Sequence, residues 1–556
     1  MSAASETSTG GVPRRPLLAA LAGLLAAGLV GYGAWAWIGR PVPLVDAPTE
    51  RLRCVSYAPF NQDQSPFQEG LVVPPAQIRT DLQALSRMTS CVRTYAVDQG
   101  LEAVPAIARE LGLKVLLGAW IGRDPVGNEK QIAGLIRLAN EHPDTVRAVI
   151  VGNEVLLRRE QPPHGLAELL QRVKAAVPVE VTYADVWEFW EKHAALADHV
   201  DFVTVHILPF WEDHPIAIRH AVSHVSDIVD IVRRIFAGKR ILIGETGWPS
   251  AGRMREGAAP GRVNQARFFR EFMAMAERRQ LDYNLIEAFD QPWKRHLEGT
   301  VGGQWGLFDT HRAAKFPLLG PVSEEPHWRW IWGAGLAGSL ALLGGALALR
   351  LRLDLARALA TGLAGQVLGA LVALQIKQIR IAAVEPFDVA MAVAGIAATA
   401  AAACCALLAA GRAPHERRAA VVPFVGVLAL LARRATRRDA LGLAIAALRL
   451  CVMVAAASTA LALAIDPRYR DFPTAVYLGP AIAFLALRAM GALATPGDGR
   501  EERGLAALVL ALAAIGLARE GLANQEALGW CATLALLALA DLPLRFSAWR
   551  RRAAPG

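Results

Sequence analysis

Two glutamates, Glu154 in the run VGNEV and Glu245 in the run IGETGWPS, each follow a stretch of aliphatic and β-branched residues. Both therefore fall where a buried strand is expected to end. Cleavage of a glycosidic bond needs such a pair: one carboxylic acid protonates the leaving oxygen, and the other carboxylate acts at the anomeric carbon. One glutamate at a strand end is more often a salt-bridge or surface residue, so the hypothesis depends on the two occurring together.

The elements that must position these glutamates are strands and helices in alternation between residues 51 and 320. Eight such units in roughly 250 residues are typical of a (β/α)₈ TIM barrel, where catalytic groups come from the carboxyl ends of the strands. A doubly wound sheet would also alternate, but it needs a glycine-rich phosphate loop after its first strand, and this sequence has none there. The predicted strands are 52–60, 91–97, 114–122, 146–154, 179–185, 200–208, 240–248 and 283–290.

The motifs VGNEV and ETGWPS resemble those of glycoside hydrolase family seventeen, the β-1,3-glucanase family of clan A. The resemblance covers roughly residues 52–318 and extends to SYAPF near the first strand, AFDQPWK at the eighth and WGLFD just after it. It implies a (β/α)₈ fold and a retaining mechanism. By the same resemblance Glu154 is the general acid/base, Glu245 is the nucleophile, and Asn153 bonds the sugar 2-hydroxyl.

The segments ETGWPSAGR, NLIEAFDQPWKR, EGTVGG and DPRYRDFP are most similar to segments of bacterial membrane proteins named for β-1,6-glucan or cyclic β-glucan synthesis. This similarity implies a β-glucan polysaccharide or oligosaccharide as the substrate and a separate glucan synthase as a further partner. Plant members of the family often carry an Asn-Glu pair where this chain has Asp290 and Gln291, so we assign no assisting carboxylate there.

Four further polar or aromatic residues are candidate substrate contacts near the predicted strand ends. Arg93, in CVRTY, is expected either to hold Glu245 ionised by charge pairing or to form a structural salt bridge. Tyr95 lies in the same run. His206 is either a contact to a carboxylate or a sugar, or a buried structural histidine, and Lys294 is either a donor to sugar hydroxyls or a structural residue.

Aromatic residues at or just beyond the strand ends suit the apolar faces of pyranose rings, and about half of them are expected to belong to the core instead. The set is Trp120, Tyr183, Trp187, Phe210, Trp211, Trp248, Trp293 and Trp305, of which Trp120, Tyr183, Trp211, Trp248 and Trp293 are predicted substrate contacts. The cysteines and histidines show no metal-ligand spacing, so neither a metal nor a cofactor is expected.

Beyond Trp328 the chain is dominated by Ala, Leu, Val and Gly, in blocks long enough to span a bilayer. An uncharged run, 16–38, is expected to be an uncleaved anchor, although Ala34-Trp35-Ala36 has the appearance of a cleavage site. The shorter run 419–432 is predicted to be interfacial or re-entrant. Seven further spans are predicted at about 330–350, 355–376, 387–411, 441–465, 474–494, 503–518 and 525–542.

The formal net charge of +9 comes from the C-terminal part, because residues 329–556 hold 24 Lys and Arg against 13 Asp and Glu. These basic residues lie in connectors between apolar blocks, where the positive-inside rule places them on the cytoplasmic side. The expected partner is therefore a lipid bilayer and not a nucleic acid. The predicted domains are a cytoplasmic tail and anchor (1–40), an extracytoplasmic barrel (41–328) and a membrane domain of about seven helices (329–556), with the barrel facing the periplasm from a bacterial inner membrane.

Cys54 and Cys91 begin two neighbouring predicted strands in what would be an oxidising compartment, so a disulfide and two free thiols both stay open. The expected function is that of a retaining transglycosylase or hydrolase of β-glucan. Both reactions use the same residues, because a covalent glucosyl-enzyme can be intercepted by water or by a sugar hydroxyl. The alternatives are a plain β-1,3-glucan hydrolase and a scaffold that only binds or transports glucan.

Overall fold

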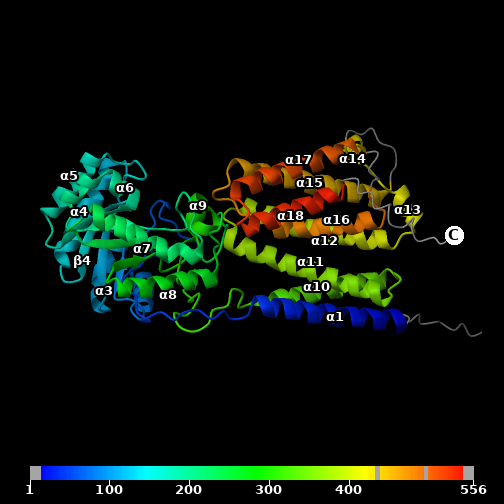
Figure 1. Ribbon diagram of the computed structural model, residues 1–556, viewed down its shortest axis with the longest axis horizontal. Coiled ribbons are helices and arrows are strands. Elements are labelled where there is room, and N and C mark those ends of the chain that lie inside the picture. Colours follow the sequence, from blue (N-terminus) through cyan, green and yellow to red (C-terminus); the bar gives the residue numbers. More distant parts are fainter. Residues whose placement is uncertain (1–13, 432–438, 494–498, 542–556) are drawn as a thin grey trace, which may run out of the picture. The chain divides into compact units, whose positions relative to one another are not determined.

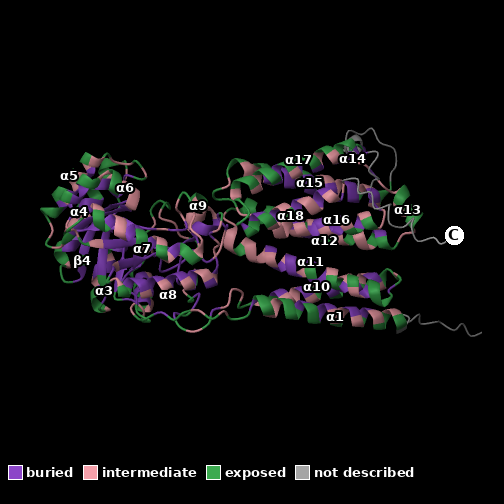
Figure 2. Cartoon of the chain, viewed as in Figure 1, coloured by how far each residue is buried: buried purple, intermediate pink, exposed green. Residues whose placement is uncertain are grey.

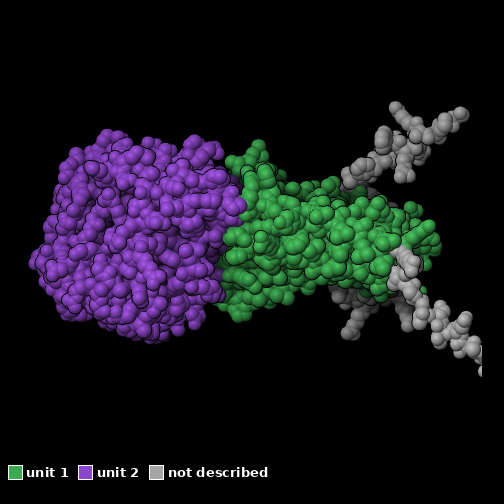
Figure 3. All heavy atoms as spheres, turned by 90° about the horizontal axis from the view of Figure 1, so that it is seen from below, with its two compact units in different colours: residues 1–40, 325–556 green, residues 41–324 purple. Residues whose placement is uncertain are grey.

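The computed structural model describes residues 14–431, 439–493 and 499–541 (Figure 1). The chain forms two compact units. Residues 41–324 make up one, and residues 1–40 together with 325–556 make up the other (Figure 3).

Residues 41–324 contain eight parallel strands that close into a barrel in sequence order, with β1 paired to both β2 and β8. Helices surround the strands (Figure 1), so the (β/α)₈ fold predicted from the alternation is confirmed. The strands are β1 (Val55–Ser56), β2 (Cys91–Arg93), β3 (Lys114–Ala119), β4 (Val146–Asn153), β5 (Glu180–Val186), β6 (Val203–His206), β7 (Ile241–Thr246) and β8 (Asp282–Leu285). The helices are α2 (Pro75–Leu85), η1 (Leu101–Ala103), α3 (Val104–Glu110), α4 (Pro125–Glu141), α5 (Pro163–Lys174), α6 (Trp187–Lys192), η2 (Ala194–His199), α7 (Ile218–Ile235), α8 (Arg262–Arg278), η3 (Pro292–Lys294) and α9 (Arg295–Gly302).

The barrel strands are buried on both faces, which is why they read as continuous apolar runs and not as alternating ones. In β4 every residue except Arg147 is buried. The covering helices bury one stripe each: α7 buries Ala221, Val225, Ile228, Val229 and Val232, the spacing of a single helical face (Figure 2). The core therefore lies inside the barrel and between the barrel and its helices.

Cys54 and Cys91 are joined by a disulfide, with their Cα atoms 4.4 Å apart. Cys54 directly precedes β1 and Cys91 begins β2, so the bond ties together the amino-terminal ends of two paired strands. Of the two alternatives left open by the sequence, the disulfide is the one that forms.

The second unit is helical. Five of its described helices are long and apolar enough to cross a membrane: α1 (Arg14–Ile38), α10 (Trp328–Ala348), α11 (Leu355–Ala382), α12 (Pro386–Ala410) and α15 (Ala440–Ile465). Two apolar helices are shorter, α16 (Thr474–Ala489) and α18 (Gln525–Leu539). The helix α17 (Arg500–Glu520) is long but is not among these five candidates. The remaining three of the eight predicted spans, which correspond to α16, α17 and α18, stay predictions.

The run 419–432 begins at the last residue of α13 (Pro414–Ala419) and contains the short helix α14 (Phe424–Leu431), and its last residue falls outside the described residues. The backbone amide of Phe424 donates to Glu502 at the start of α17, 2.7 Å away. Arg449, inside α15, is buried and forms an ion pair with Asp541. Buried charges of this kind need such partners, because an unpaired charge in an apolar bundle is costly.

Candidate active site

Glu154 lies immediately after the last residue of β4, Asn153, on the rim formed by the carboxyl ends of the strands. Its backbone has a φ of 52°, in the left-handed region that residues other than glycine seldom adopt. Two backbone hydrogen bonds hold this conformation: the Glu154 amide donates to Ala184 at 2.8 Å, and the Arg158 amide donates to the Glu154 carbonyl at 2.9 Å. The turn after β4 thus fixes where the Glu154 side chain begins.

Glu245 comes from β7, and its side chain is almost fully buried at the same rim. Its Oε1 accepts hydrogen bonds from Arg93 Nη1 at 3.2 Å and from the Tyr95 hydroxyl at 2.8 Å. Within the described part of the chain, Oε2 has no hydrogen-bond partner. One carboxylate oxygen is therefore anchored and the other is left available to a substrate.

Arg93, the last residue of β2, connects four strands beneath the rim. Its guanidinium donates to the Gly244 carbonyl at 2.7 Å and to Asn153 Oδ1 at 2.5 Å, in addition to Glu245. The expected charge pairing with Glu245 is formed. Because Arg93 is only 1 % exposed, it orients the residues around it, and a direct contact to a sugar is not formed by this side chain.

His206, the last residue of β6, lies between Arg93 and Glu154. Its Nε2 is 3.3 Å from Arg93 Nη1, and because a guanidinium only donates, Nε2 must accept. The hydrogen-bond network therefore assigns the proton to Nδ1, which donates to Glu154 Oε1 at 3.0 Å. His206 is fully buried, so it contacts a carboxylate, one of the expected alternatives, and not a sugar.

Glu154 and Glu245 face each other closely. One oxygen of each carboxylate and one ring nitrogen of His206 all lie within 4.8 Å of one another. Such a trio has the donor types of a metal site, but the guanidinium of Arg93 within hydrogen-bond distance of both Glu245 and His206 places a fixed positive charge against any cation.

The pKa of Glu154 lies below its usual value. Burial raises the pKa of this carboxyl, but the hydrogen bond from His206 and the positive charges of Arg158 and Arg93 outweigh that effect. The free protein therefore favours the ionised form of Glu154.

Tyr95 belongs to a chain of hydrogen bonds that ends on Glu245. Asn284 Nδ2 donates to Ser56 Oγ at 2.7 Å, and Ser56 Oγ lies 2.8 Å from the Tyr95 hydroxyl. Because the Tyr95 hydroxyl donates to Glu245, Ser56 must donate to Tyr95. Burial and the neighbouring Glu245 charge raise the pKa of Tyr95 well above its usual value, so the phenol stays a donor.

Three of the predicted aromatic contacts keep exposed surface beyond the strand ends. Trp120, just after β3, is 40 % exposed, and the guanidinium of Arg158 lies 4.1 Å from its ring centroid. Trp211 and Trp293 are half-buried. The indole of Trp293 donates to Gln291 at 2.8 Å, which holds the ring in place. These rings have surface with which to stack on a sugar.

Two other predicted contacts are corrected by the structure, because Tyr183 and Trp248 are fully buried and offer no surface to a sugar. Tyr183 packs on Trp190 of α6, with the ring centroids 5.5 Å apart, and its hydroxyl accepts from the Leu156 amide at 3.0 Å. Trp248 packs between aromatic rings, and its indole donates to the Ala259 carbonyl at 3.0 Å.

Lys294 follows β8 and pairs with both carboxylate oxygens of Glu287, at 3.1 and 2.8 Å. Burial raises the pKa of Glu287 to about 7, although the Lys294 charge opposes this shift. The expected role of Lys294 as a sugar-hydroxyl donor is thus limited to the remaining ammonium proton.

Sequence reasoning missed two buried carboxyls at this rim, Glu287 after β8 and Asp185 near the end of β5. The pKa of Asp185 is raised to about 6, chiefly by burial, and Asp185 accepts from the Tyr183 hydroxyl and from the Val186 amide at 2.8 Å. The rule that singled out Glu154, an acidic residue where a predicted strand ends, would have found Asp185 at the end of the predicted strand 179–185. It would have missed Glu287, which lies inside the predicted strand 283–290.

A closed (β/α)₈ barrel with two facing carboxylates at its carboxyl-end rim is the arrangement that glycoside hydrolases and transglycosylases need. The model of the BtgE/BtgC glycoside hydrolase domain matches residues 54–306. The chain belongs to this family: it is 30 % identical to a glucan 1,3-β-glucosidase of Arthroderma benhamiae over an alignment that covers 45 % of this chain and 86 % of the relative. It is an enzyme of the glycoside hydrolase and transglycosylase type.

Two further proteins are similar to this chain. A glucan 1,3-β-glucosidase of Schizosaccharomyces pombe is 29 % identical, over 43 % of this chain and 79 % of the relative. A crystal structure titled as a glycoside hydrolase family 17 β-1,3-glucanosyltransferase from Rhizomucor miehei is 26 % identical, covers 48 % of this chain and 97 % of that one, and gives a TM-score of 0.43. These relatives are fungal, so the particular similarity to bacterial membrane proteins stays a prediction.

Proposed function

We propose that this protein is a membrane-bound, retaining β-glucan transglycosylase that branches, elongates or cyclises β-1,3/β-1,6-glucan through a covalent glucosyl-enzyme. The observation that carries the retaining mechanism is the separation of Glu154 and Glu245, whose nearest carboxylate oxygens lie within 4.8 Å. Retaining enzymes have carboxyl groups about 5–5.5 Å apart, whereas inverting enzymes need about 6.5–9.5 Å to admit a water molecule.

In the first step the Glu154 carboxylic acid protonates the glycosidic oxygen while the free Oε2 of Glu245 attacks the anomeric carbon. The bond to the leaving sugar breaks and a glucosyl ester forms on Glu245. Arg93 and Tyr95 keep Oε1 of Glu245 in place during the attack. Asn153, whose Oδ1 accepts from Arg93, has its amide NH₂ oriented to donate to the sugar 2-hydroxyl.

In the second step the Glu154 carboxylate takes a proton from an incoming hydroxyl, which attacks the anomeric carbon and releases Glu245. Water as the acceptor gives hydrolysis, and a sugar hydroxyl gives transfer. The pKa of Glu154, held low by the hydrogen bond from His206 and by nearby cations, suits the base needed in this step.

The glucan specificity rests on the relatives, which are named for β-1,3-glucosidase and β-1,3-glucanosyltransferase activities. Exposed Trp120 and half-buried Trp211 and Trp293 supply rings for successive glucose units. The substrate is a β-glucan polysaccharide or oligosaccharide.

The placement at a membrane rests on the five helices that are long and apolar enough to cross one. The anchor (1–40), the barrel domain (41–328) and the membrane domain (329–556) would place the barrel in the periplasm of a bacterium, next to the inner membrane. In the sequence the barrel lies between α1 and α10, two of these five helices, which would hold it at the membrane. A glucan delivered by a separate synthase would then meet the site at high local concentration, which favours transfer over hydrolysis.

Full-length protein incubated with laminari-oligosaccharides tests the proposal, with the products resolved by size and linkage. Products longer than the substrate, or branched products, are expected, and the Glu245→Ala variant should form none. Release of shorter sugars alone would leave the plain hydrolase as the function. No reaction at all would refute the catalytic assignment.

A further inference from the structure

The most exposed aromatic residue of the barrel unit is Phe67, a residue that the proposed mechanism does not use. Its exposed fraction is 71 %, the highest among the Phe, Tyr and Trp residues of 41–324, all of which the structure describes. Phe67 lies in the loop that follows β1, so it belongs to the same rim as Glu154 and Glu245. A single exposed apolar side chain is ordinary, so its meaning depends on what surrounds it.

Phe67 packs against Trp293, one of the half-buried rings at the rim. The ring centroids are 5.6 Å apart, and the angle between the ring planes is 80°. Trp293 follows β8, which is paired to β1, so the two rings come from neighbouring loops. Trp293 is held in turn by an edge-to-face contact with Phe60 and by the hydrogen bond from its indole to Gln291. An edge-to-face contact covers at most one face of each ring, so Phe67 keeps a free face on which a pyranose ring can stack.

Hydrogen bonds hold the loop that carries Phe67. The Phe67 amide donates to Ser65 Oγ at 3.2 Å, and the Gln68 amide donates to the Ser65 carbonyl at 3.0 Å. The side-chain amide of Gln99, in the loop after β2, donates to the Pro66 carbonyl at 2.9 Å. A ring that is already in place loses little conformational entropy when a sugar stacks on it.

Trp293 connects Phe67 to the catalytic residues, because the next residue along the chain, Lys294, lies close to the nucleophile. Burial opposes the charged form of Lys294, but the negative charges of Glu287 and of other carboxylates, including Glu245, raise its pKa. The loop after β8 therefore runs beside Glu245, and Phe67 adds a ring beyond Trp293.

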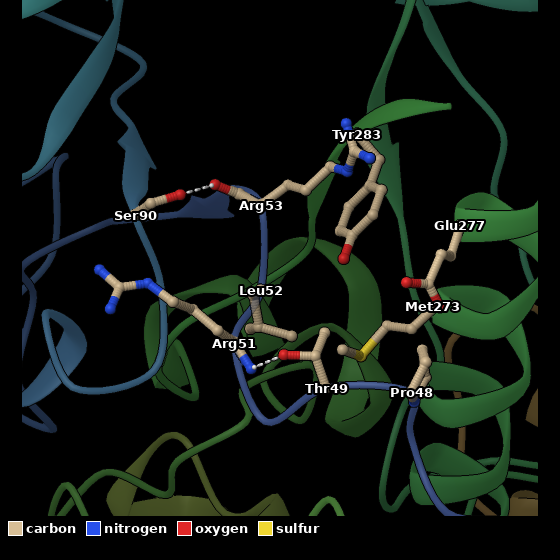
Figure 4. A pocket seen from close by; sticks show the side chains of 9 residues that line it. All are labelled: Pro48, Thr49, Arg51, Leu52, Arg53, Ser90, Met273, Glu277 and Tyr283. Carbon is tan, nitrogen blue, oxygen red and sulfur yellow. Dashed lines mark hydrogen bonds between the residues drawn. The ribbon is translucent and has the colours of Figure 1, made fainter. Parts of the chain in front are cut away.

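The opposite end of the barrel offers no such surface. A cavity of about 260 Å³ lies there, at the amino ends of β1, β2 and β8 (Figure 4). Its lining includes Leu52, Met273 and Tyr283, which are only 1, 2 and 4 % exposed, so no ring face is open to a sugar. The two exposed aromatic residues of 41–324, Phe67 and Trp120, both lie at the catalytic rim.

The order of the strands decides which part of a glucan reaches Phe67. In the proposed mechanism Glu154 protonates the oxygen that joins the leaving sugar to the sugar attacked by Glu245, so the leaving sugar lies on the Glu154 side. Glu154 follows β4, and in a closed barrel of eight strands in sequence order β8 and β1 lie across from β4 and β5. The part of the glucan that stays on Glu245 extends away from the leaving sugar, and therefore toward the loops after β8 and β1.

We propose that Phe67 and Trp293 form a donor-side subsite that stacks on a glucose unit of the glucan segment retained by Glu245, and that this subsite sets the length of the segment that is transferred. The proposal rests on the proposed function, because the roles of Glu154 and Glu245 define the donor side. A trisaccharide places at most two sugars on the donor side, whereas a hexasaccharide can place up to five there. A long donor therefore gains a stacking contact that a short donor does not reach.

The first test varies the length of the donor, with full-length protein that carries Phe67→Ala. The ratio of kcat/KM for laminarihexaose to kcat/KM for laminaritriose should fall roughly three- to tenfold, the effect of losing one stacked ring. Phe67→Trp keeps an aromatic face and should retain the wild-type ratio. Val45→Ala, which changes an exposed apolar residue before β1, is the matched control. A wild-type ratio in Phe67→Ala would overturn the proposal.

A second measurement separates donor binding from acceptor binding. With laminarihexaose as the donor and a short laminari-oligosaccharide labelled at its reducing end as the acceptor, the mass added to the label gives the length of the transferred segment. Phe67→Ala should shift this length toward shorter segments and leave the KM of the acceptor as it is. A higher KM for the acceptor with an unchanged segment length would place Phe67 on the acceptor side and contradict the proposal.

Calorimetric titration of the Glu245→Ala protein separates a failure of this proposal from a failure of the proposed function, because binding needs no turnover. Adding Phe67→Ala should weaken the binding of laminarihexaose by a larger factor than the binding of laminaritriose. If the wild type releases only shorter sugars while this difference persists, the transferase function fails and the subsite stands. Equal affinity for laminarihexaose with and without Phe67→Ala refutes the subsite.

Discussion

Nη1 of Arg93 lies 3.3 Å from Nε2 of His206, an arrangement that leaves the histidine only one proton to offer, on Nδ1. That proton is directed at Glu154, whose Oε1 is 3.0 Å away. An arginine from β2 therefore acts on a glutamate after β4 through a histidine from β6.

The pH dependence of catalysis follows from this contact. The first step needs protonated Glu154, so kcat/KM falls as the pH rises through the lowered pKa of that carboxyl. His206→Phe removes the hydrogen bond that lowers this pKa, so the fall should move to higher pH. The measurement is kcat/KM against pH, with His164→Phe, an exposed residue of α5, as the control. A fall that stays in place or moves to lower pH contradicts the assignment.

The two glutamates should respond differently to replacement. Glu245→Ala should abolish turnover and recover with azide as an α-glucosyl azide, since azide attacks from the face vacated by the nucleophile. Glu154→Ala should lose the acid step and be rescued as a β-product, mainly on substrates with good leaving groups. The anomeric configuration of each product is determined by NMR. An active Glu245→Ala enzyme would refute the assignment of Glu245 as the nucleophile.

Tyr95→Phe tests the anchoring of Glu245. It removes the 2.8 Å hydrogen bond to Oε1, and a bond to a charged group contributes about 1.5–3 kcal/mol, so kcat should fall roughly 10- to 100-fold. KM should change little, because the bond positions the attacking group. Tyr57→Phe is the control: its hydroxyl bonds Asp81 at 3.2 Å, away from Glu245. Equal losses in both variants would show a structural effect only.

Glu287 should make the barrel less stable as the pH rises. Its pKa is about 7 in the folded protein against 4.5 in its ordinary state, so between these values the folded state binds the extra proton and stability decreases with pH. Glu287→Gln should lose this decrease, which amounts to on the order of 3 kcal/mol. Denaturant titrations, followed by tryptophan fluorescence at a pH near each of these two pKa values, measure the change in the free energy of unfolding. Glu168→Gln, at an exposed site on α5, should behave as the wild type does.

The membrane topology predicts where reporter fusions work. Alkaline phosphatase is active only outside the cytoplasm, so a fusion after Pro321 should be active, and fusions after Gly411 or at Gly556 should be inactive. The reason is the cluster of basic residues in each connector that is expected inside. An active fusion at Gly556 would mean that the number of spans is wrong, most simply because 419–432 crosses the membrane.

The sequence alone determined the barrel and the position of its two glutamates. Strands of parallel barrels end on one rim, so a glutamate that follows β4 and one in β7 must share it once the alternation is recognised. The disulfide was left open, because it depends on a Cα separation that spacing along the chain does not define.

Only the tertiary structure decided which side chains complete the site. Trp248 follows Glu245 by three residues, yet its ring lies in the core, because it packs against Phe210 and against Phe268 of α8. The convergence of Arg93 on Asn153, His206 and Glu245 likewise depends on the stagger between strands that are far apart in the sequence. The hydrophobic pattern records that a residue is buried; what it touches is set by the packing of the whole barrel.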